Sequence, residues 1–252
     1  MIDPRIKQFR NFLKDDVRLT IDFRKTDQRM GKRPPAIEKP YRQNSERIDL
    51  VPPGSWQNIQ PVDIVRAIEN RKSRRVFTNQ PLTMEDLSFL LWATQGIRKI
   101  SKSGSTFRTV PSAGARHSFE TYLCVLNVEN LSPGLYRYLP INHQIILEQS
   151  PPKLKSKIIE ATYGQGFVGK ASVLFIWTTL CYRMEWRYGA AAHKVIAIDS
   201  GHVCQNLYLA AEAIKAGTCA IAAYHQELTD RLLNVDGEDE FTIYMAAVGK
   251  RK

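Results

Sequence analysis

The run Arg71-Lys-Ser-Arg-Arg75 carries the strongest local signal for chemistry in this sequence. In an extended segment, side chains two residues apart point to the same face, so Arg71, Ser73 and Arg75 would converge on one ligand. Two guanidinium groups beside a hydroxyl suit a phosphate, or the edge of an anionic ring that accepts several hydrogen bonds. A solvated charge run at the end of a helix has the same composition. Spacing alone therefore leaves both interpretations open.

Three more segments combine small or cationic residues in ways that suit a flat anionic ligand. Glycine and alanine let backbone amides approach such a ligand closely, and a serine in the first segment adds a hydroxyl. Each segment alone is also compatible with an ordinary turn. The three segments are Pro111-Ser-Ala-Gly-Ala115, Ala220-Ile-Ala-Ala223 and Gly249-Lys-Arg-Lys252.

Other familiar motifs are absent or misplaced. The segment Gly164-Gln-Gly-Phe-Val-Gly169 matches the G-x-G-x-x-G fingerprint of dinucleotide sites. That fingerprint needs a strand before it and a helix after it, whereas the predicted order here is reversed, so we interpret the match as a helix end and a loop. The sequence has no P-loop and no G-x-S-x-G elbow. Its five histidines lack partners at zinc-ligand spacing, so we predict no metal site.

The charge of the chain is high but dispersed. The 252 residues include 36 Lys and Arg against 25 Asp and Glu, a net charge of +11. A nucleic-acid binder would more often show a basic stripe or tail with interleaved aromatic residues, which this chain lacks. We therefore predict no nucleic-acid partner.

The sequence also argues against membranes and secretion. The most apolar stretch, residues 171–180, is about half of the roughly 20 residues that a spanning helix needs. The first residues form no apolar signal region. The four cysteines lie in apolar surroundings without a C-x-x-C pair, which is typical of reduced core residues. We expect a cytoplasmic protein with no membrane contact.

Two regions are expected along the chain: an N-terminal arm over residues 1–55 and one main domain over residues 56–252. The arm is rich in proline and poor in apolar residues, so it should lie on the main domain or on a partner chain, with one short helix at 6–13. In the main domain, the periodicity predicts α+β organisation, with strands early and helices interleaved later. We expect helices at 62–68, 83–96, 153–163, 193–215 and 229–233, strands at 121–128, 135–138, 144–148, 173–179 and 242–248, and a short segment at 219–223.

The helix at 193–215 is the most hydrophobic one and should be central. Small or apolar residues surround most of its circumference. We expect Gly217 to end this helix. We expect His202 to be a hydrogen-bonded core residue, and Asp199, three residues earlier, could pair with it. Its predicted inner face consists of Val195, Ile198, His202, Leu207, Ala210 and Ile214.

Taken together and in this order, the segments resemble the nitroreductase superfamily of FMN-dependent oxidoreductases. The resemblance is greatest to its SagB-type branch, which includes flavin dehydrogenases that oxidise azoline rings in ribosomally made peptides. It covers about residues 62–250. The segments that carry it are Arg71–Arg75, Arg108–His117 with Glu120–Tyr122, Pro133–Tyr138, Trp186–Gly189, Asp199–Tyr208, Ala216–Tyr224 and Val248–Lys250.

The resemblance implies an α/β sandwich around a central hydrophobic helix, and a homodimer with FMN at the subunit interface. It implies that the basic run (Arg71, Lys72, Ser73 and Arg75) binds the FMN phosphate and the N1–C2 edge of the ring. It further implies that Pro111, Ser112, Ala113 and Gly114 line the isoalloxazine ring, that Ala222 and Ala223 present backbone N–H groups near N5, and that Lys250 or Arg251 completes the phosphate site.

The sequence departs from the family at the expected catalytic pair. The peptide-ring dehydrogenases share a Lys-Tyr pair for proton abstraction, and this chain has Arg187-Tyr188. An arginine stays protonated and is a poor base, so Arg187 would only stabilise charge, whereas Tyr188 could act as an acid or base. A glycine is usual where Ala222 stands and a proline where Ser118 stands.

We therefore expect an FMN-dependent oxidoreductase that transfers hydride by a ping-pong mechanism. It would be either an NAD(P)H-dependent reductase or a SagB-type dehydrogenase, acting on a small molecule or a peptide. The alternative is a catalytically silent flavin-binding protein that keeps the fold.

Overall fold

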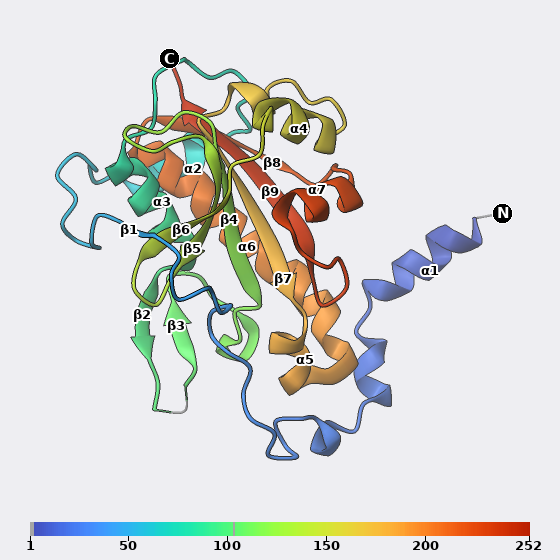
Figure 1. Cartoon of the computed structure of the whole chain (residues 1–252). Helices are drawn as coiled ribbons and strands as arrows, with labels where there is room; N and C mark the ends of the chain where they lie inside the picture. The colour runs from blue at the N-terminus through green and yellow to red at the C-terminus, as the bar shows by residue number, and fades with distance from the viewer. Residues whose placement is uncertain (1–2, 103) are drawn as a thin grey trace.

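Seven strands form one antiparallel sheet, and helices cover both of its faces (Figure 1). The computed structural model describes residues 3–102 and 104–252. The strand order is β1-β6-β5-β4-β7-β9-β8. The predicted α+β class is therefore confirmed. The strands are β1 (Arg47–Asp49), β4 (Phe119–Val125), β5 (Gly134–Leu139), β6 (Gln144–Gln149), β7 (Val173–Leu180), β8 (Ala216–Ile221) and β9 (Glu240–Lys250), and a separate hairpin is formed by β2 (Ile97–Ile100) and β3 (Thr106–Arg108).

All helices except α5 agree with the predicted segments to within a few residues, and α5 was not predicted. Thr83 begins α3 as the expected capping box, because its hydroxyl accepts the N–H of Asp86 at 3.0 Å while the Asp86 carboxylate accepts the N–H of Thr83 at 2.9 Å. No helix within the described residues is long and apolar enough to cross a membrane. The helices are α1 (Pro4–Phe12), α2 (Ile64–Asn70), α3 (Met84–Gln95), α4 (Leu154–Ala161), α5 (Tyr182–Tyr188), α6 (Ala192–Ala213) and α7 (Gln226–Leu233).

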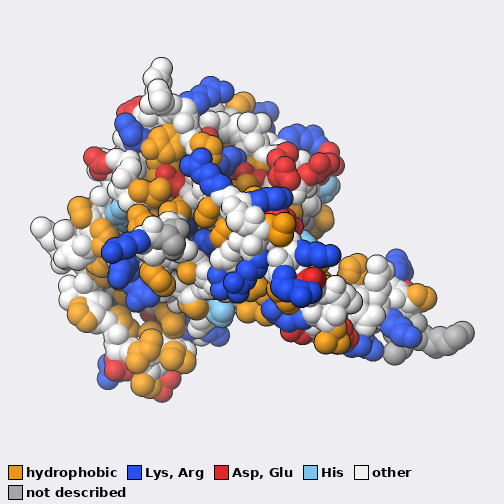
Figure 2. All heavy atoms as spheres, turned by 90° about the horizontal axis from the view of Figure 1, so that it is seen from below, with side chains coloured by type: hydrophobic (Ala, Val, Ile, Leu, Met, Phe, Trp, Pro, Cys, Tyr) orange, Lys and Arg blue, Asp and Glu red, His pale blue; other side chains and the backbone are white. Residues whose placement is uncertain are grey.

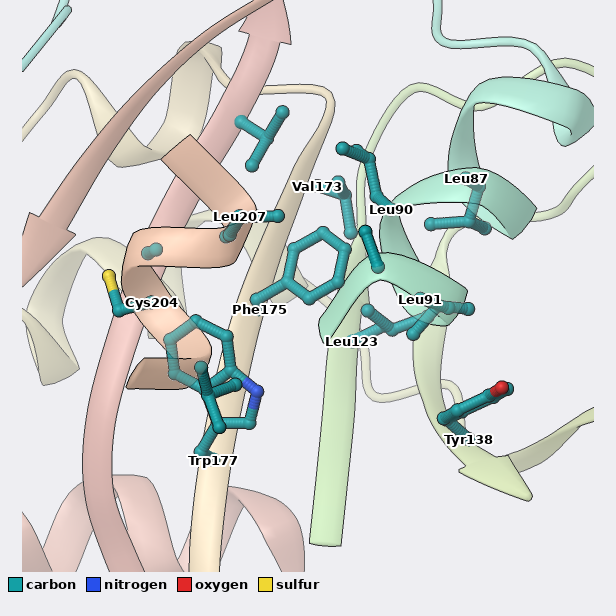
Figure 3. Close-up of a cluster of buried hydrophobic side chains, with 14 of the residues drawn as sticks. Leu87, Leu90, Leu91, Leu123, Tyr138, Val173, Phe175, Trp177, Cys204 and Leu207 are labelled. Carbon is teal, nitrogen blue, oxygen red and sulfur yellow. The ribbon is translucent and has the colours of Figure 1, made fainter. Parts of the chain in front are cut away.

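Strand β7 separates two hydrophobic clusters, one on each face of the sheet. Its side chains alternate, so Val173, Phe175 and Trp177 join the cluster under α3 and α6. Leu174 and Ile176 point the other way and join the cluster under α4 and α7. Figure 3 shows the first cluster, with side chains of α3 and α6 packed over β4 and β7. The four cysteines are buried and free, as predicted.

The central helix α6 is present, and its buried face was predicted in part. Leu207, Ala210 and Ile214 are buried as predicted, but Ile198 is 50% exposed and His202 is exposed as well. The buried side also includes Ile196 and Val203. Small residues on several sides of the helix leave no single apolar stripe in the sequence, so its rotation is set by packing against α3 and the sheet.

The end of α6 also differs from the prediction. The helix stops at Ala213, and Lys215 adopts a left-handed backbone conformation with φ near 53° that reverses the chain. Gly217 then lies within β8, where its missing Cβ gives room to the side chain of Arg74. The glycine is needed for close packing rather than for ending the helix.

Much of the N-terminal arm runs across the main domain, which is one of the two expected arrangements. The guanidinium group of Arg108 donates to the carbonyl oxygen of Ile37 at 3.2 Å. Strand β1 adds to the edge of the sheet beside β6. Helix α1, in contrast, projects from the body (Figure 1).

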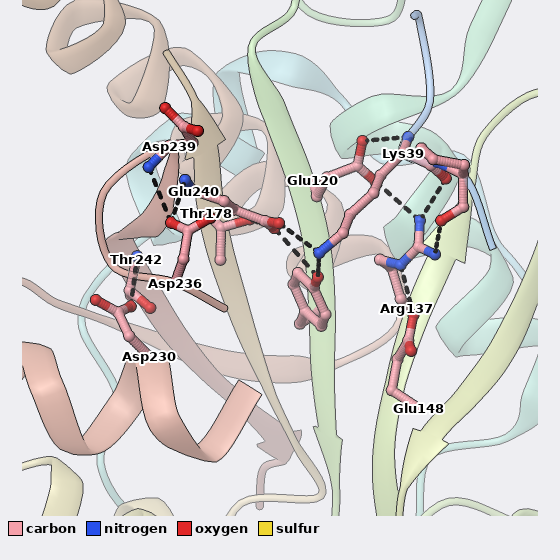
Figure 4. A network of polar contacts seen from close by, with 12 residues as sticks. Lys39, Glu120, Arg137, Glu148, Thr178, Asp230, Asp236, Asp239, Glu240 and Thr242 are labelled. Carbon is pink, nitrogen blue, oxygen red and sulfur yellow. Dashed lines mark hydrogen bonds and ion pairs between the residues drawn. The ribbon is translucent and has the colours of Figure 1, made fainter. Parts of the chain in front are cut away.

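A buried network of charges joins this arm to the sheet (Figure 4) and, through Arg183, to α5. The Glu120 carboxylate pairs with Arg183 at 2.5 Å and with Arg137 at 3.4 Å, and it accepts the backbone N–H of Lys39 at 2.9 Å. The Lys39 ammonium continues the network to Glu240 at 2.5 Å. Burial alone would raise the pKa of Glu120, but the two guanidinium groups lower this pKa below its usual value.

We expect Glu120→Gln to lower the free energy of unfolding by about 3–5 kcal/mol, because it leaves two buried guanidinium groups with less countercharge. The control is Glu148→Gln, since Glu148 is 32% exposed and its ion pair among the described residues is with Arg137. Urea unfolding at neutral pH measures both variants, and equal losses would contradict the prediction.

Wild type and Glu120→Gln also test how the stability of the fold depends on pH. The lowered pKa of Glu120 means that its carboxylate stabilises the fold above the unfolded carboxyl pKa of about 4.3. This contribution is lost as the pH falls through the lower folded pKa. The difference between wild type and Glu120→Gln should therefore shrink in acid.

Candidate active site

The basic run lies as an extended segment against the edge strand β8. Ser73 pairs with Thr218, and the N–H of Arg74 donates to the carbonyl oxygen of Thr218 at 2.9 Å. The Arg71 guanidinium lies 5.2 Å from the centre of the Tyr208 ring, and the Ser73 hydroxyl lies 2.9 Å from the Tyr208 hydroxyl. Arg71 and Ser73 thus share one side of the segment, as their spacing predicts.

Arg75 faces the same neighbourhood as Ser73, because both side chains act on the thiol of Cys219. Burial raises the pKa of Cys219, while the charge of Arg75 and a hydrogen bond with Ser73 oppose that rise. Arg74 points elsewhere, packing over Gly217. Arg71 and Ser73 thus contact Tyr208, whereas Arg74 packs over Gly217.

A hydroxyl that the sequence reasoning missed organises this region. Tyr208 of α6 accepts the backbone N–H of Ala220 at 2.9 Å while it contacts Ser73. It therefore fixes the basic run relative to the end of β8, after which the exposed Ala222 and Ala223 follow. The only signal in the sequence is a tyrosine at a buried position of a hydrophobic helix.

The two cationic residues near the end of the chain have different places. Lys250 is engaged inside the protein, where its ammonium pairs with Asp86 at 2.9 Å and donates to the Ile214 carbonyl at 2.8 Å. Arg251 pairs with Glu212 at 2.7 Å and lines a cavity of about 370 Å³ beside the basic run. The cavity residues are Lys72, Ser73, Arg74, Arg75, Val76, Phe77, Arg251 and Lys252.

A hydrogen bond from the loop at 111–115 to Asp199 of α6 supports this loop. The Asp199 carboxylate accepts the N–H of Ala113 at 3.3 Å, and the Ser112 hydroxyl accepts the N–H of His117 at 3.0 Å. Burial raises the pKa of Asp199, although its hydrogen bonds to Ser112 and Ala113 oppose this. The predicted pairing of Asp199 with His202 is weak, at 3.9 Å.

The predicted catalytic pair lies directly on this loop. Gly114 has a φ of 59°, and a Cβ placed on it would come within 2.6 Å of the Arg187 Nε and 2.7 Å of the Tyr188 hydroxyl. The loop is therefore shaped to admit both side chains. A flat ligand on the loop would meet a guanidinium group and a phenol at its edge.

The N-terminal arm holds the helix that carries this pair, a contact that the sequence did not indicate. The N–H of Gln28 donates to the Trp186 carbonyl at 2.8 Å, and the Arg187 guanidinium donates to the Gln28 side-chain oxygen at 3.3 Å. The Trp186 indole N–H donates to the Lys32 carbonyl at 3.1 Å. The arm thus contributes to the position of Arg187.

The predicted site residues fall into two groups that contact different parts of α6. Asp199 supports the loop and Tyr208 supports the basic run, and these two residues are nine positions apart, a rise of about 13 Å along the helix. In Figure 1, the C-terminus and α2 lie at one end of the molecule and α5 at the other. Within one chain, the two groups are therefore separated along α6.

Both groups fit the chemistry of a flavin nucleotide. The first group offers several guanidinium groups, a hydroxyl and an adjoining cavity, which suit a phosphate. The second offers a backbone without side-chain bulk at Gly114, which suits a planar ring. In the described residues, no group of three or more His, Cys, Asp or Glu side chains is arranged to hold a metal ion.

Comparison with known proteins agrees with this geometry. The family model described as "Nitroreductase family" matches residues 68–250. The chain belongs to the nitroreductase family, and it is an oxidoreductase of that family.

Three relatives illustrate the similarity. A proposed nitroreductase of Methanocaldococcus jannaschii is 29% identical over 196 residues, which cover 77% of this chain and 94% of that protein. A proposed nitroreductase structure from Ralstonia eutropha has a TM-score of 0.67 and 25% identity, covering 85% of this chain and 94% of the other. The microcin B17-processing protein McbC of Escherichia coli is 25% identical over 138 residues, covering 53% of this chain and 50% of McbC.

We expect Gly114→Ala to be destabilising by about 1–2 kcal/mol from its left-handed backbone alone, with a further loss from the displaced Arg187 and Tyr188. Gly54→Ala is the matched control, because Gly54 has a φ of 85° and no heavy atom within 4 Å of the added Cβ. Chemical unfolding compares the two. A loss for Gly114→Ala no greater than that of the control would contradict the packing described here.

Proposed function

We propose that the protein is an FMN-dependent oxidoreductase that works as a homodimer with two shared sites. The observation that carries the proposal is the separation of the two predicted groups along α6. A two-fold pairing that sets two α6 helices antiparallel would bring the basic run of one chain to the loop of the other. The exposed side of α6, which includes Ile198, is available for such a pairing.

In this arrangement, each flavin would be held by both chains. Arg71, Lys72, Ser73 and Arg75 would bind the phosphate and the N1–C2 edge, and Arg251 would complete the phosphate site in preference to Lys250. Segment 111–114 of a second copy would line the ring, and the N–H groups of Ala222 and Ala223 would face N5. When bound, FMN supplies a centre that accepts and donates hydride.

The chain's own residues would orient the substrate and manage its charge and protons. Arg187 stays protonated at any working pH, so it would stabilise negative charge on a substrate over the ring. The Tyr188 hydroxyl, beside Gly114, would donate or accept a proton. Cations near the N1–C2 edge would favour the reduced, anionic form of the ring.

We expect purified protein to be yellow and Arg75→Ala to weaken FMN binding by at least about tenfold, because a charge-assisted contact contributes roughly 1.5–3 kcal/mol. Arg231→Ala is the matched control, since Arg231 is exposed and pairs only with Glu227 on α7. Fluorescence titration with FMN measures both variants. A colourless protein that takes up no FMN would disprove the cofactor.

Subunit mixing tests the shared site. Arg75→Ala and Pro111→Trp chains should each lose FMN, because the first removes a cation and the second fills the space over the loop. After equal amounts are unfolded and refolded together, about a quarter of the sites should bind FMN again, since half of the dimers are mixed and each has one intact site. No recovery, with both variants folded and dimeric, would place each site within one chain.

The direction of catalysis is a separate question. We infer that an NAD(P)H-dependent reductase would lose its flavin absorbance on anaerobic mixing with NADPH. The similarity to McbC favours, as the second candidate, a SagB-type dehydrogenase with a peptide substrate, and such an enzyme would keep its colour until its own substrate was added. Colour that persists with NADPH and with azoline peptides would indicate a catalytically silent flavin protein.

A further inference from the structure

Helix α1 presents an apolar surface that its own chain does not cover. Ile6, Phe9, Phe12 and Leu13 are 49%, 70%, 49% and 68% exposed, and no residue of α1 is buried. Figure 2 shows this segment standing clear of the body, with hydrophobic and basic side chains side by side. A helix of nine residues is marginal by itself in water, so its conformation depends on a surface that packs against it.

Helix α2, at the other end of the molecule, also exposes apolar side chains. Only Ala67 of this helix is buried, while Ile64, Val65 and Ile68 are 58%, 58% and 57% exposed. Exposed clusters of this kind mark interaction surfaces. Each of the two helices therefore has an apolar face without a partner in its own chain.

The segment that follows α1 lies close to the surface proposed for subunit pairing. The 3₁₀ turn Asp16–Thr20, which follows α1, contacts the turn Gly189–Ala191 that leads directly into α6. An antiparallel pairing of α6 helices would place this N-terminal end against the C-terminal end of α6 in the second copy. Helix α2 contacts α6, and Arg71, which follows α2, lies 5.2 Å from the ring of Tyr208 in the C-terminal half of α6.

Charged residues flank the apolar faces of both helices. Lys7 and Arg10 of α1 are exposed cations, whereas Arg5 pairs with Asp3. Exposed Asp63 and Glu69 lie at the two ends of the apolar face of α2, and the exposed cation Arg66 lies between them. Opposite charges around an apolar contact favour one docking orientation over others. A docking orientation that sets Lys7 and Arg10 near the two carboxylates and away from Arg66 is therefore favoured.

We propose that α1 packs its apolar face, formed by Ile6, Phe9 and Leu13, on Ile64, Val65 and Ile68 of a second copy of this chain. Each dimer then contains two exchanged arms. This proposal rests on the homodimer of the proposed function and adds a second contact, outside the flavin site, that strengthens it. It also gives a physical reason for the arm's otherwise uncovered apolar residues.

The first experiment uses cysteine cross-linking in the full-length protein. A Phe9→Cys chain and an Ile68→Cys chain are mixed, dissociated and reassociated, and then oxidised mildly. A disulfide-linked dimer of the two different chains is expected, because the four native thiols are buried and do not compete. Gln8→Cys mixed with Ile68→Cys is the control, and it should cross-link much less. Equal or absent cross-linking for the two mixtures would overturn the proposal.

The second experiment measures the dimer dissociation constant by sedimentation. Phe9→Glu should raise it by about tenfold or more, the effect of exposing one large apolar side chain, whereas Gln8→Glu, with the same change in charge, should leave it nearly constant. A basic amphipathic helix could instead bind anionic lipid. Flotation with phosphatidylglycerol vesicles tests that alternative: binding lost in Phe9→Glu without a change in dimerisation would overturn the exchange.

FMN uptake is recorded in parallel so that the two proposals fail separately. Specific cross-linking in a protein that takes up no FMN would keep the exchanged arm and reject the flavin site. FMN uptake without specific cross-linking and without a change in dimer stability would keep the flavin site and reject the exchanged arm.

Discussion

The buried carboxylate of Glu120 is the interaction on which the placement of the candidate catalytic pair depends. It binds Arg183 of α5, Arg137 of β5 and the backbone of Lys39, so one side chain joins a helix, two strands and the arm. The C-terminal end of that same helix carries Arg187 and Tyr188. Since a buried ion pair tolerates little rearrangement without loss of countercharge, α5 has a fixed position relative to the sheet. The loop at Gly114 then packs against the side chains of Arg187 and Tyr188 at the end of this helix.

Helix α6 imposes the second constraint, because it is a rigid spacer. Asp199 supports one half of the candidate site and Tyr208 the other, and neither half can move along the helix. The proposed dimer, in which each site draws on two chains, is consistent with this separation. The separation follows from hydrogen bonds within one chain and the rise of an α-helix.

The sequence predicted those features whose causes are local. The capping box at Thr83, the strand at 173–179 and the face shared by Arg71 and Ser73 all follow from spacing within a few residues. The rotation of α6 could not be predicted, because Asp199 is buried only through its contact with a loop 86 residues earlier. The contact between Gln28 and Arg187 joins residues 159 positions apart, and no local pattern encodes it. The family resemblance named the site residues, but only the fold separates them into two groups.

The order of strands in the sheet bears on how the protein is made. Strand β9 lies between β7 and β8, although it follows every other strand along the chain. On the ribosome, β7 therefore waits with an open edge of apolar residues until residue 250 has been synthesised, and β8 cannot join the sheet before then. Such an edge can pair with other nascent chains. The interval between the synthesis of β7 and of β9 is thus a period in which this edge has no intramolecular partner.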